Sequence, residues 1–130
     1  MSNSDEIRTP IVEVWRNVLL VSIVGVLDTN RTKILTERLL DQLVEQEALV
    51  VILDLDGVSV MDTLVAKHVI NTIKTIKLMG PEVIISGIRP DVAQTMVSLG
   101  VNFDVETFNL LRRAMEHAMN ILGLKVVSSK

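Results

Sequence analysis

The stretch from Ala48 to Gly80, ALVVILDLDGVSVMDTLVAKHVINTIKTIKLMG, decides the fold. It opens with an uninterrupted apolar run, turns acidic at Asp54-Leu55-Asp56 and breaks at Gly57. A β-branched apolar run bounded by turn signals is typical of a strand buried on both faces, which requires parallel neighbours and covering helices. An amphipathic helix then begins at Asp62-Thr63. Open α/β folds place their sites at the carboxyl ends of strands, so this dipeptide is the centre of the functional argument.

The composition fits one small α/β domain. The 130 residues are 48% hydrophobic but only 2% aromatic, so the core must be aliphatic. No apolar run approaches the roughly 18 residues that cross a bilayer, and the polar start lacks the apolar core of a signal peptide. Absence of cysteine excludes disulfides and fits the cytoplasm. A net charge of -3, without a basic face, argues against nucleic-acid binding.

The segments before this stretch predict a hairpin and a helix. Ile11 to Trp15 and Val18 to Val26 are candidate strands joined by Arg16-Asn17. A two-residue connection indicates an antiparallel pair, which places the first strand at an edge of the sheet. Asp28-Thr29-Asn30 then supplies helix-capping residues, and Arg31 to Gln46 has leucines at helical spacing.

The segments after Thr63 complete the pattern. Val83 to Ile88 predicts a third parallel strand, and Arg89-Pro90-Asp91 opens a short helix that ends at Gly100. Val101 to Phe103 is a candidate last strand, and Thr107 is a candidate cap for a final helix that includes Phe108. The expected buried face of the helix after Thr63 comprises Ala66, Val69, Ile70, Ile73 and Leu78.

The resulting order is β-β-α-β-α-β-α-β-α. It predicts a single α/β domain over residues 1–130, with its core from about residue 10 to residue 123. The central sheet should be mostly parallel, with one antiparallel edge strand and four flanking helices.

The chemistry of many enzymes is missing. No GxxxxGK[ST] or GxGxxG loop occurs to hold a phosphate, and no Ser-His-Asp or GxSxG arrangement is visible. His68 and His117 lie on separate predicted helices, and neither has a second ligand at metal spacing. We therefore expect no enzymatic activity, no metal and no cofactor.

Two Asp-Thr pairs remain, Asp28-Thr29 and Asp62-Thr63. Each follows a strand and opens a helix, so both should lie on one edge of the sheet. One interpretation is helix capping alone, because Asp and Thr are common N-caps. The other is phosphorylation, since a helix N-terminus exposes a hydroxyl and offers N–H groups to a phosphate. Arg89, on the same edge, would then be a partner for the phosphate.

An acidic end to the central strand, at Asp54 and Asp56, also occurs in response-regulator receiver domains. Those domains need an acidic pair after the first parallel strand and a lysine after the last. Here only Asp28 follows the first strand, and no lysine follows Val101 to Phe103. The receiver interpretation is therefore disfavoured.

The stretch from Val51 to Thr63, VILDLDGVSVMDT, resembles the strand, loop and phosphorylation site of the STAS domain, the SpoIIAA-like fold of anti-sigma factor antagonists. Lys77 to Gly80, Ile85 to Thr95 and Leu99-Gly100 are similar to stressosome scaffolds of the RsbR type. The opening from Pro10 is compatible with either the RsbR or the RsbS type. The resemblance extends to about Gly123.

The resemblance implies roles for the site residues. Thr63 matches the main phosphoacceptor for a serine/threonine switch kinase, and Thr29 matches a second phosphorylated threonine. Asp28, Asp62 and Arg89 are the expected flanking or partner-binding residues. The implied function is a cytoplasmic stress-signalling scaffold that sequesters the kinase and releases it after phosphorylation, which regulates an alternative sigma factor or a similar output. Other STAS scaffold proteins are the implied partners, in homo- or hetero-oligomers.

Two features depart from the family pattern. RsbS-type proteins carry serine at the position of Thr63. RsbR-type proteins carry a separate sensor domain, often globin-like, where this chain has only Met1 to Thr9. The chain is therefore expected to be either a stand-alone STAS protein or the STAS half of a longer scaffold. A free-standing anti-sigma factor antagonist, which binds an anti-sigma kinase and stays small, is an alternative function. A small-ligand or nucleotide-binding α/β module is a further alternative, which saturable ligand binding would reveal.

Overall fold

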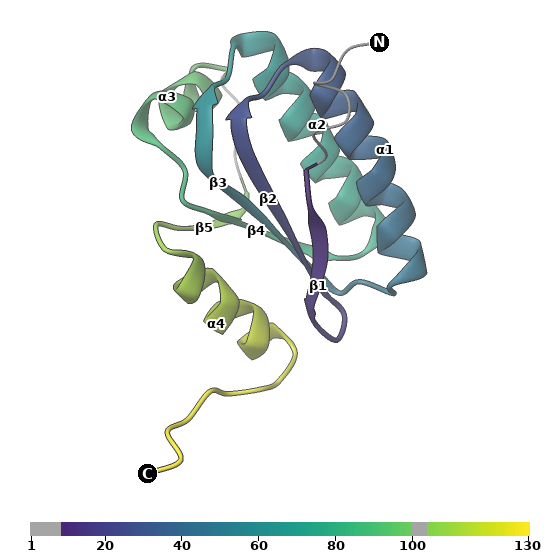
Figure 1. Ribbon diagram of the computed structural model, residues 1–130, viewed down its shortest axis with the longest axis vertical. Coiled ribbons are helices and arrows are strands. Elements are labelled where there is room, and N and C mark those ends of the chain that lie inside the picture. Colours follow the sequence, from purple (N-terminus) through teal and green to yellow (C-terminus); the bar gives the residue numbers. More distant parts are fainter. Residues whose placement is uncertain (1–8, 100–103) are drawn as a thin grey trace.

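The computed structural model describes residues 9–99 and 104–130. Five strands and four helices follow one another in the predicted order (Figure 1). They are β1 (Ile11–Trp15), β2 (Val18–Val26), α1 (Thr29–Glu45), β3 (Val50–Val60), α2 (Thr63–Met79), β4 (Glu82–Ser86), α3 (Pro90–Ser98), β5 (Glu106–Phe108) and α4 (Leu111–Ile121).

The strands form one sheet in the order β1-β2-β3-β4-β5. β1 is antiparallel to β2, whereas the other three neighbouring pairs are parallel. Asn17 has a positive φ of 67° in the two-residue turn between β1 and β2, a backbone conformation that asparagine tolerates well. The prediction of a mostly parallel sheet with an antiparallel edge strand is confirmed.

Aliphatic side chains cover the two faces of the sheet unequally. On one face, leucines of α1 and valines and isoleucines of α2 pack against β2, β3 and β4, and Val92 and Met96 of α3 complete this larger cluster. On the other face, Ala114 and Ala118 of α4 are buried against Val18, Val50, Ile52 and Ile84, with partly buried Leu111, Met115 and Leu122 packed around them. This smaller cluster covers the amino-terminal half of β2 and β3 and leaves their carboxyl ends open.

The central strand is longer than predicted. The sequence predicted an end at Asp54-Leu55-Asp56 and a break at Gly57, but β3 continues to Val60. The reason is β2, which offers partners as far as Val26 and pairs with Gly57 through Val24. A Cβ at Gly57 would lie 3.0 Å from Val24 Cγ2 and 3.1 Å from the carbonyl oxygen of Ile23, so glycine permits this close approach of the strands.

Three local predictions were wrong: Thr107 as a helix cap, Phe108 as part of the last helix, and Leu78 as a buried residue. Thr107 and Phe108 belong to β5, and α4 begins after Leu110, which makes no side-chain cap. Leu78 is 90% exposed, and Ile76 takes the last buried position of α2 instead. The predicted cap at Gly100 and the predicted strand from Val101 to Phe103 lie outside the described residues.

Candidate functional site

The ends of β2 and β3 bring the two Asp-Thr pairs to the same edge of the sheet. Val26 and Val60 are register partners in this parallel pair. Beyond them, the backbone N–H of Leu27 donates to the carbonyl oxygen of Val60 at 3.3 Å. Asp28 and Asp62 each come two residues after one of these paired valines, so α1 and α2 begin at neighbouring points of this edge.

The aspartates cap the two helices in the same way. Asp28 Oδ1 accepts from the backbone N–H of Arg31 at 2.8 Å, and Asp62 Oδ1 accepts from that of Val65 at 2.8 Å. Both aspartates have extended backbone conformations, as N-cap residues do. Capping therefore belongs to the aspartates and not to the threonines that follow them.

Thr29 and Thr63 are the first residues of α1 and α2, and both are exposed. Within residues 9–99 and 104–130, neither hydroxyl group takes part in a hydrogen bond. A kinase could therefore reach either hydroxyl without breaking a cap. Orphan backbone N–H groups and the helix dipole favour a negative group at such positions.

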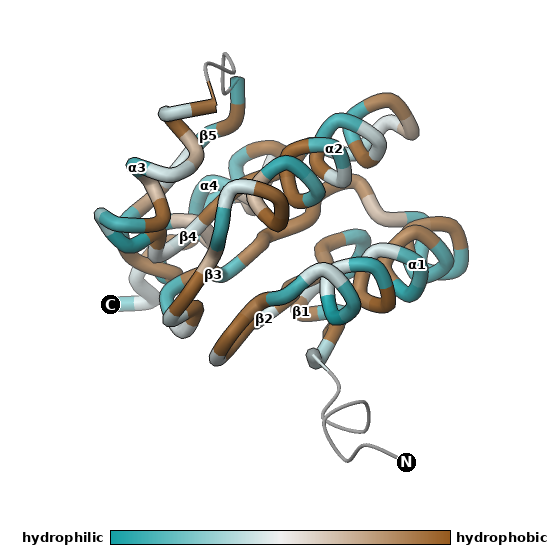
Figure 2. The backbone as a smooth tube through the Cα atoms, turned by 90° about the horizontal axis from the view of Figure 1, so that it is seen from above, coloured by the Kyte–Doolittle hydropathy of each residue, from teal (hydrophilic) through white to brown (hydrophobic). Residues whose placement is uncertain are grey.

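Exposed apolar side chains surround the two helix starts. Val24, Val26, Val60 and Leu64 are each more than half exposed, and we call these four residues the apolar rim. Figure 2 shows hydrophobic residues at the ends of β2 and β3, on either side of the gap between α1 and α2. Val24, Val26 and Val60 lie near the carboxyl ends of β2 and β3, whereas α4 covers the amino-terminal halves of these strands. No helix among the described residues therefore shields the three valines.

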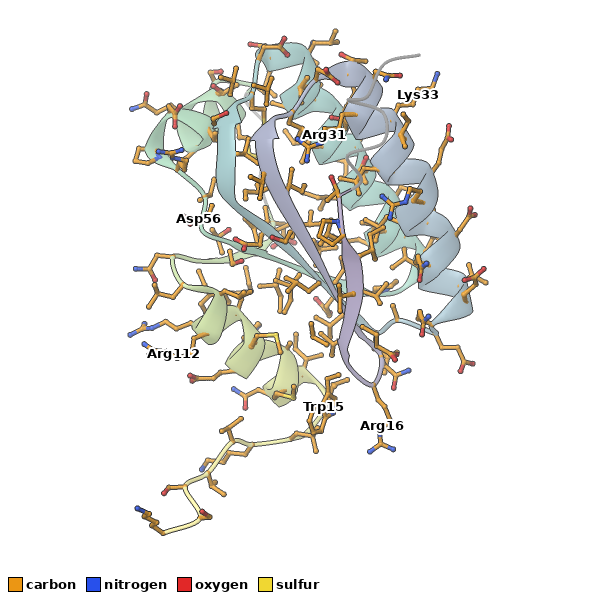
Figure 3. The ribbon with its side chains drawn as sticks, in the orientation of Figure 1. Trp15, Arg16, Arg31, Lys33, Asp56 and Arg112 are labelled. Atoms are coloured by element: carbon orange, nitrogen blue, oxygen red, sulfur yellow. The ribbon has the colours of Figure 1, made fainter. Side chains whose placement is uncertain are left out.

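Arg31 is a site residue that the sequence analysis did not single out. Its side chain turns back from α1 toward the end of β2, where Nη1 donates to the carbonyl oxygens of Val24 and Val26 (Figure 3). Its Nη2 donates to Thr9 Oγ1 at 3.1 Å. The only signal in the sequence was its spacing, three residues after the capping Asp28.

Asp54 has a structural role in this fold. Its Oδ1 accepts from Ser86 Oγ at 3.2 Å and from the backbone N–H of Asp56 at 3.2 Å, which ties β3 to the end of β4. Gly87 follows with a φ of +67°, and a Cβ there would lie 2.5 Å from Asp56 Cβ. This tight junction explains the acidic end of the strand without receiver-type chemistry.

Arg89 lies at the start of α3, after the end of β4. It is the exposed N-cap residue of α3 and makes no side-chain capping bond. β4 ends at Ser86, opposite Asp54, whereas β3 continues to Val60 before Thr63 follows. In the part of the chain that the structure describes, no hydrogen bond or ion pair joins Arg89 to Asp28 or Asp62. Its pairing with a phosphate stays a prediction.

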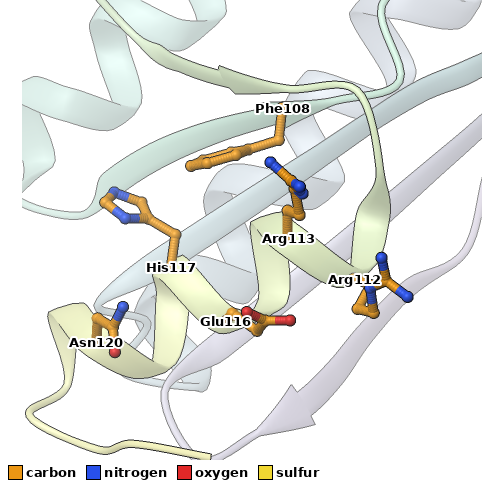
Figure 4. A pocket seen from close by; sticks show the side chains of 6 residues that line it. All are labelled: Phe108, Arg112, Arg113, Glu116, His117 and Asn120. Carbon is orange, nitrogen blue, oxygen red and sulfur yellow. The ribbon is translucent and has the colours of Figure 1, made fainter.

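A separate groove lies between α4 and β5 (Figure 4). In Figure 1, α4 lies toward the opposite end of the molecule from the starts of α1 and α2. Phe108, Arg112, Arg113, Glu116, His117 and Asn120 line it. The rings of Phe108 and His117 are 5.2 Å apart between centroids and tilted by 45°, a packing contact that accounts for the histidine. The described residues include no group of three or more His, Cys, Asp or Glu side chains that could hold a metal ion.

Comparison with known proteins identifies the class. The family model described as the STAS domain matches residues 9–114, so the chain belongs to the STAS domain family. Within this family the chain is similar to co-antagonists of the RsbR type. It is 37% identical over 124 residues to the RsbT co-antagonist protein RsbRA of Bacillus subtilis (strain 168), an alignment that covers 95% of this chain and 45% of that protein.

Solved structures share the fold. A variant of Moorella thermoacetica RsbS superposes with a TM-score of 0.78 at 24% identity, covering 90% of this chain and 99% of that one. A chain from a structure of the stressosome, described as a signal integration and transduction hub, superposes with a TM-score of 0.73 at 22% identity, covering 87% and 98%. The anti-sigma factor antagonist SpoIIAA in its unphosphorylated form superposes with a TM-score of 0.67 at 12% identity, covering 86% and 97%, so the SpoIIAA-like architecture predicted from the sequence is confirmed.

The chain spans less than half the length of the RsbR-type proteins that it matches. Among the described residues, every helix is too short or too polar to traverse a lipid bilayer.

Proposed function

We propose that this STAS chain is a non-enzymatic scaffold in cytoplasmic stress signalling. It binds a serine/threonine switch kinase, keeps it inactive and releases it when Thr63 is phosphorylated. The released kinase then acts on a downstream regulator, such as the control system of an alternative sigma factor. Similarity to an RsbT co-antagonist over 95% of the chain supports the kinase partner, and the shared fold of a stressosome chain fits co-assembly with other STAS proteins.

The observation that carries the proposal is the exposure of Thr63 next to a satisfied cap. Asp62 already holds the N–H group of Val65, so phosphorylation need not unwind the helix. The threonine also lies between two members of the apolar rim, Val60 and Leu64, in the sequence. A partner that rests on these side chains must come close to the Thr63 hydroxyl.

Phosphorylation would end such a contact through charge and desolvation. A phosphate adds about -1.5 to -2 charges at neutral pH. It would stand beside the Asp62 carboxylate, and burying both charges under a docked protein carries a penalty of several kcal/mol per ion unless each is paired. A surface that binds the kinase through apolar contact therefore loses affinity once Thr63 is modified.

Thr29 is a second acceptor in this proposal. It begins the neighbouring helix on the same edge, beside Asp28, so its phosphate would lie at the border of the same docking surface. Arg89, further along the edge, is the proposed cation for a phosphate. We assign Thr63 the release and Thr29 an adjustment of the extent of the response.

The test is to incubate the chain with its cognate switch kinase and ATP and to map the phosphate by mass spectrometry. The proposal predicts that Thr63 is labelled first, that Thr63→Ala abolishes this label, and that Thr63→Ser keeps it. The main label on another residue would overturn the assignment.

Light scattering, with and without other STAS scaffold proteins, tests the assembly. A chain that stays monomeric in both cases would contradict the scaffold role and favour the free-standing antagonist.

A further inference from the structure

At the end of β2 lies an edge that no strand among residues 9–99 and 104–130 covers. β1 begins at Ile11, which pairs with Val21, so the antiparallel ladder stops before Val24 and Val26. The register of β2 against β3 also shifts near Gly25, which has a positive φ of 90°. Carbonyl groups on such an edge need donors. Arg31 supplies them, because its Nη1 donates to the carbonyl oxygens of both valines.

The Arg31 guanidinium also contacts Thr9, which comes shortly before β1 in the chain. Its Nη2 donates to Thr9 Oγ1 at 3.1 Å, and Nη1 of Arg38, two turns further along α1, donates to the carbonyl oxygen of Thr9 at 2.9 Å. Thr9 is only 3% exposed as a result. Thr9, which comes two residues before β1 begins, is therefore held against α1 by two arginines.

Arg31 thus takes part in two separate sets of hydrogen bonds, one through its backbone and one through its side chain. Its backbone N–H is the group that Asp28 caps, directly after Thr29 and Asn30 begin the helix. Its side chain connects Thr9 to the carbonyl groups of two apolar-rim residues, Val24 and Val26. A planar guanidinium can serve these separate acceptors in fixed directions, which a lysine ammonium cannot do.

We propose that Arg31 is a positioning residue that relays the placement of Thr9 to the edge carrying Thr29. When the Thr9 hydroxyl is in place, Arg31 keeps the end of β2 and the start of α1 ordered. When Thr9 is displaced, Arg31 loses one of its fixed acceptors, and the β2–α1 connection opens more often. The consequence for the kinase, a changed rate of Thr29 phosphorylation, rests on the proposed function, but the coupling itself does not.

The relay is tested by amide hydrogen exchange on the whole chain, followed by mass spectrometry. Thr9→Val removes the hydroxyl acceptor at nearly constant shape, and Thr9→Ser retains it. We expect Thr9→Val and Arg31→Lys each to speed exchange between residues 24 and 32 by roughly fivefold to tenfold, the factor expected from the loss of one hydrogen bond. Thr9→Ser should leave that exchange unchanged. The double variant, Thr9→Val with Arg31→Lys, should exchange no faster than Arg31→Lys alone, because both changes break one linkage.

Arg38→Lys is the matched control, since it perturbs only the Thr9 carbonyl contact and should affect the edge less than Arg31→Lys. Unchanged exchange at residues 24–32 in Thr9→Val would overturn the proposed coupling and leave Arg31 with a local hydrogen-bonding role alone. Faster exchange throughout the sheet, including β4, would overturn it as well, because that pattern reports general destabilisation. The exchange measurement needs no kinase, so it separates failure of the relay from failure of the proposed function. With the kinase present, Thr9→Val should change the rate at Thr29 and not the rate at Thr63.

Discussion

The backbone N–H of Leu27 donates to the carbonyl oxygen of Val60 at 3.3 Å, beyond the last register pair of β2 and β3. This bond joins the two strand ends immediately before Asp28 and Asp62. The starts of α1 and α2 are consequently held side by side, and Thr29 and Thr63 share one surface. Thr29 therefore lies at the border of the surface that carries Thr63.

The cap at Asp62 should contribute measurably to stability. Replacing Asp62 by Ala removes the acceptor for the Val65 N–H group, and we expect a loss of about 1 kcal/mol in the free energy of unfolding. Asp62→Asn should restore most of that loss, since asparagine caps equally well. Urea denaturation provides the measurement. Asp41→Ala, at an exposed position within α1, is the control, and an equal effect of both alanine variants would contradict the capping role.

The junction of β3 and β4 should tolerate no side chain at Gly87. A Cβ there meets Asp56 Cβ at 2.5 Å, in addition to the strain of a positive φ. We expect Gly87→Ala to lower the free energy of unfolding by about 3 kcal/mol, combining overpacking with backbone strain. Gly123→Ala has a similar φ of +79° but open space around its Cβ, so about 1 kcal/mol is expected. Equal losses in thermal or urea denaturation would show that the contact with Asp56 relaxes freely.

Much of this architecture follows from local patterns in the sequence. The β-branched runs gave the central strands, the two-residue connection gave the hairpin, and the Asp-Thr pairs marked both helix starts. These signals depend on interactions within a few residues. β5 gave no such signal, because Glu106 to Phe108 is short and partly polar, and its place depends on pairing with β4.

Other features depend on the packed structure. Gly57, directly after the acidic run Asp54-Leu55-Asp56, was predicted to break the strand, but the length of β2 determines that β3 continues through it. Arg31 looked like one more charged residue on a helix. Its importance depends on where Thr9 lies, 22 positions earlier in the chain. The apolar rim is exposed because helices cover the two sheet faces unequally. Predicting this exposure would also have required the position of α4.

The apolar rim should contribute to kinase capture. Val26→Asp places a charge in the middle of the proposed contact, and we expect the affinity for the cognate kinase to fall at least about tenfold, because the charge must be desolvated on binding. Val44→Asp is the control, since Val44 is 68% exposed on α1 and lies outside the rim. Titration calorimetry compares the two variants. Equal affinities would mean that the kinase binds elsewhere.

The two threonines should have different roles although they share an edge. Thr63→Asp is expected to weaken kinase capture, since a carboxylate supplies part of the charge of a phosphate. Thr29→Asp is expected to leave capture largely intact while it changes the extent of the signalling response. A pull-down of the kinase with each variant distinguishes them. Loss of capture only in Thr29→Asp would reverse the assigned roles.

The most direct test of the account measures how much kinase stays bound to the immobilised chain before and after ATP is added. ATP should release the kinase from the wild-type chain and from Thr63→Ser, since both offer a hydroxyl at the start of α2. The Thr63→Ala chain should retain its kinase in the presence of ATP. Release from Thr63→Ala to the same extent as from the wild type would contradict the claim that phosphorylation of Thr63 is the switch.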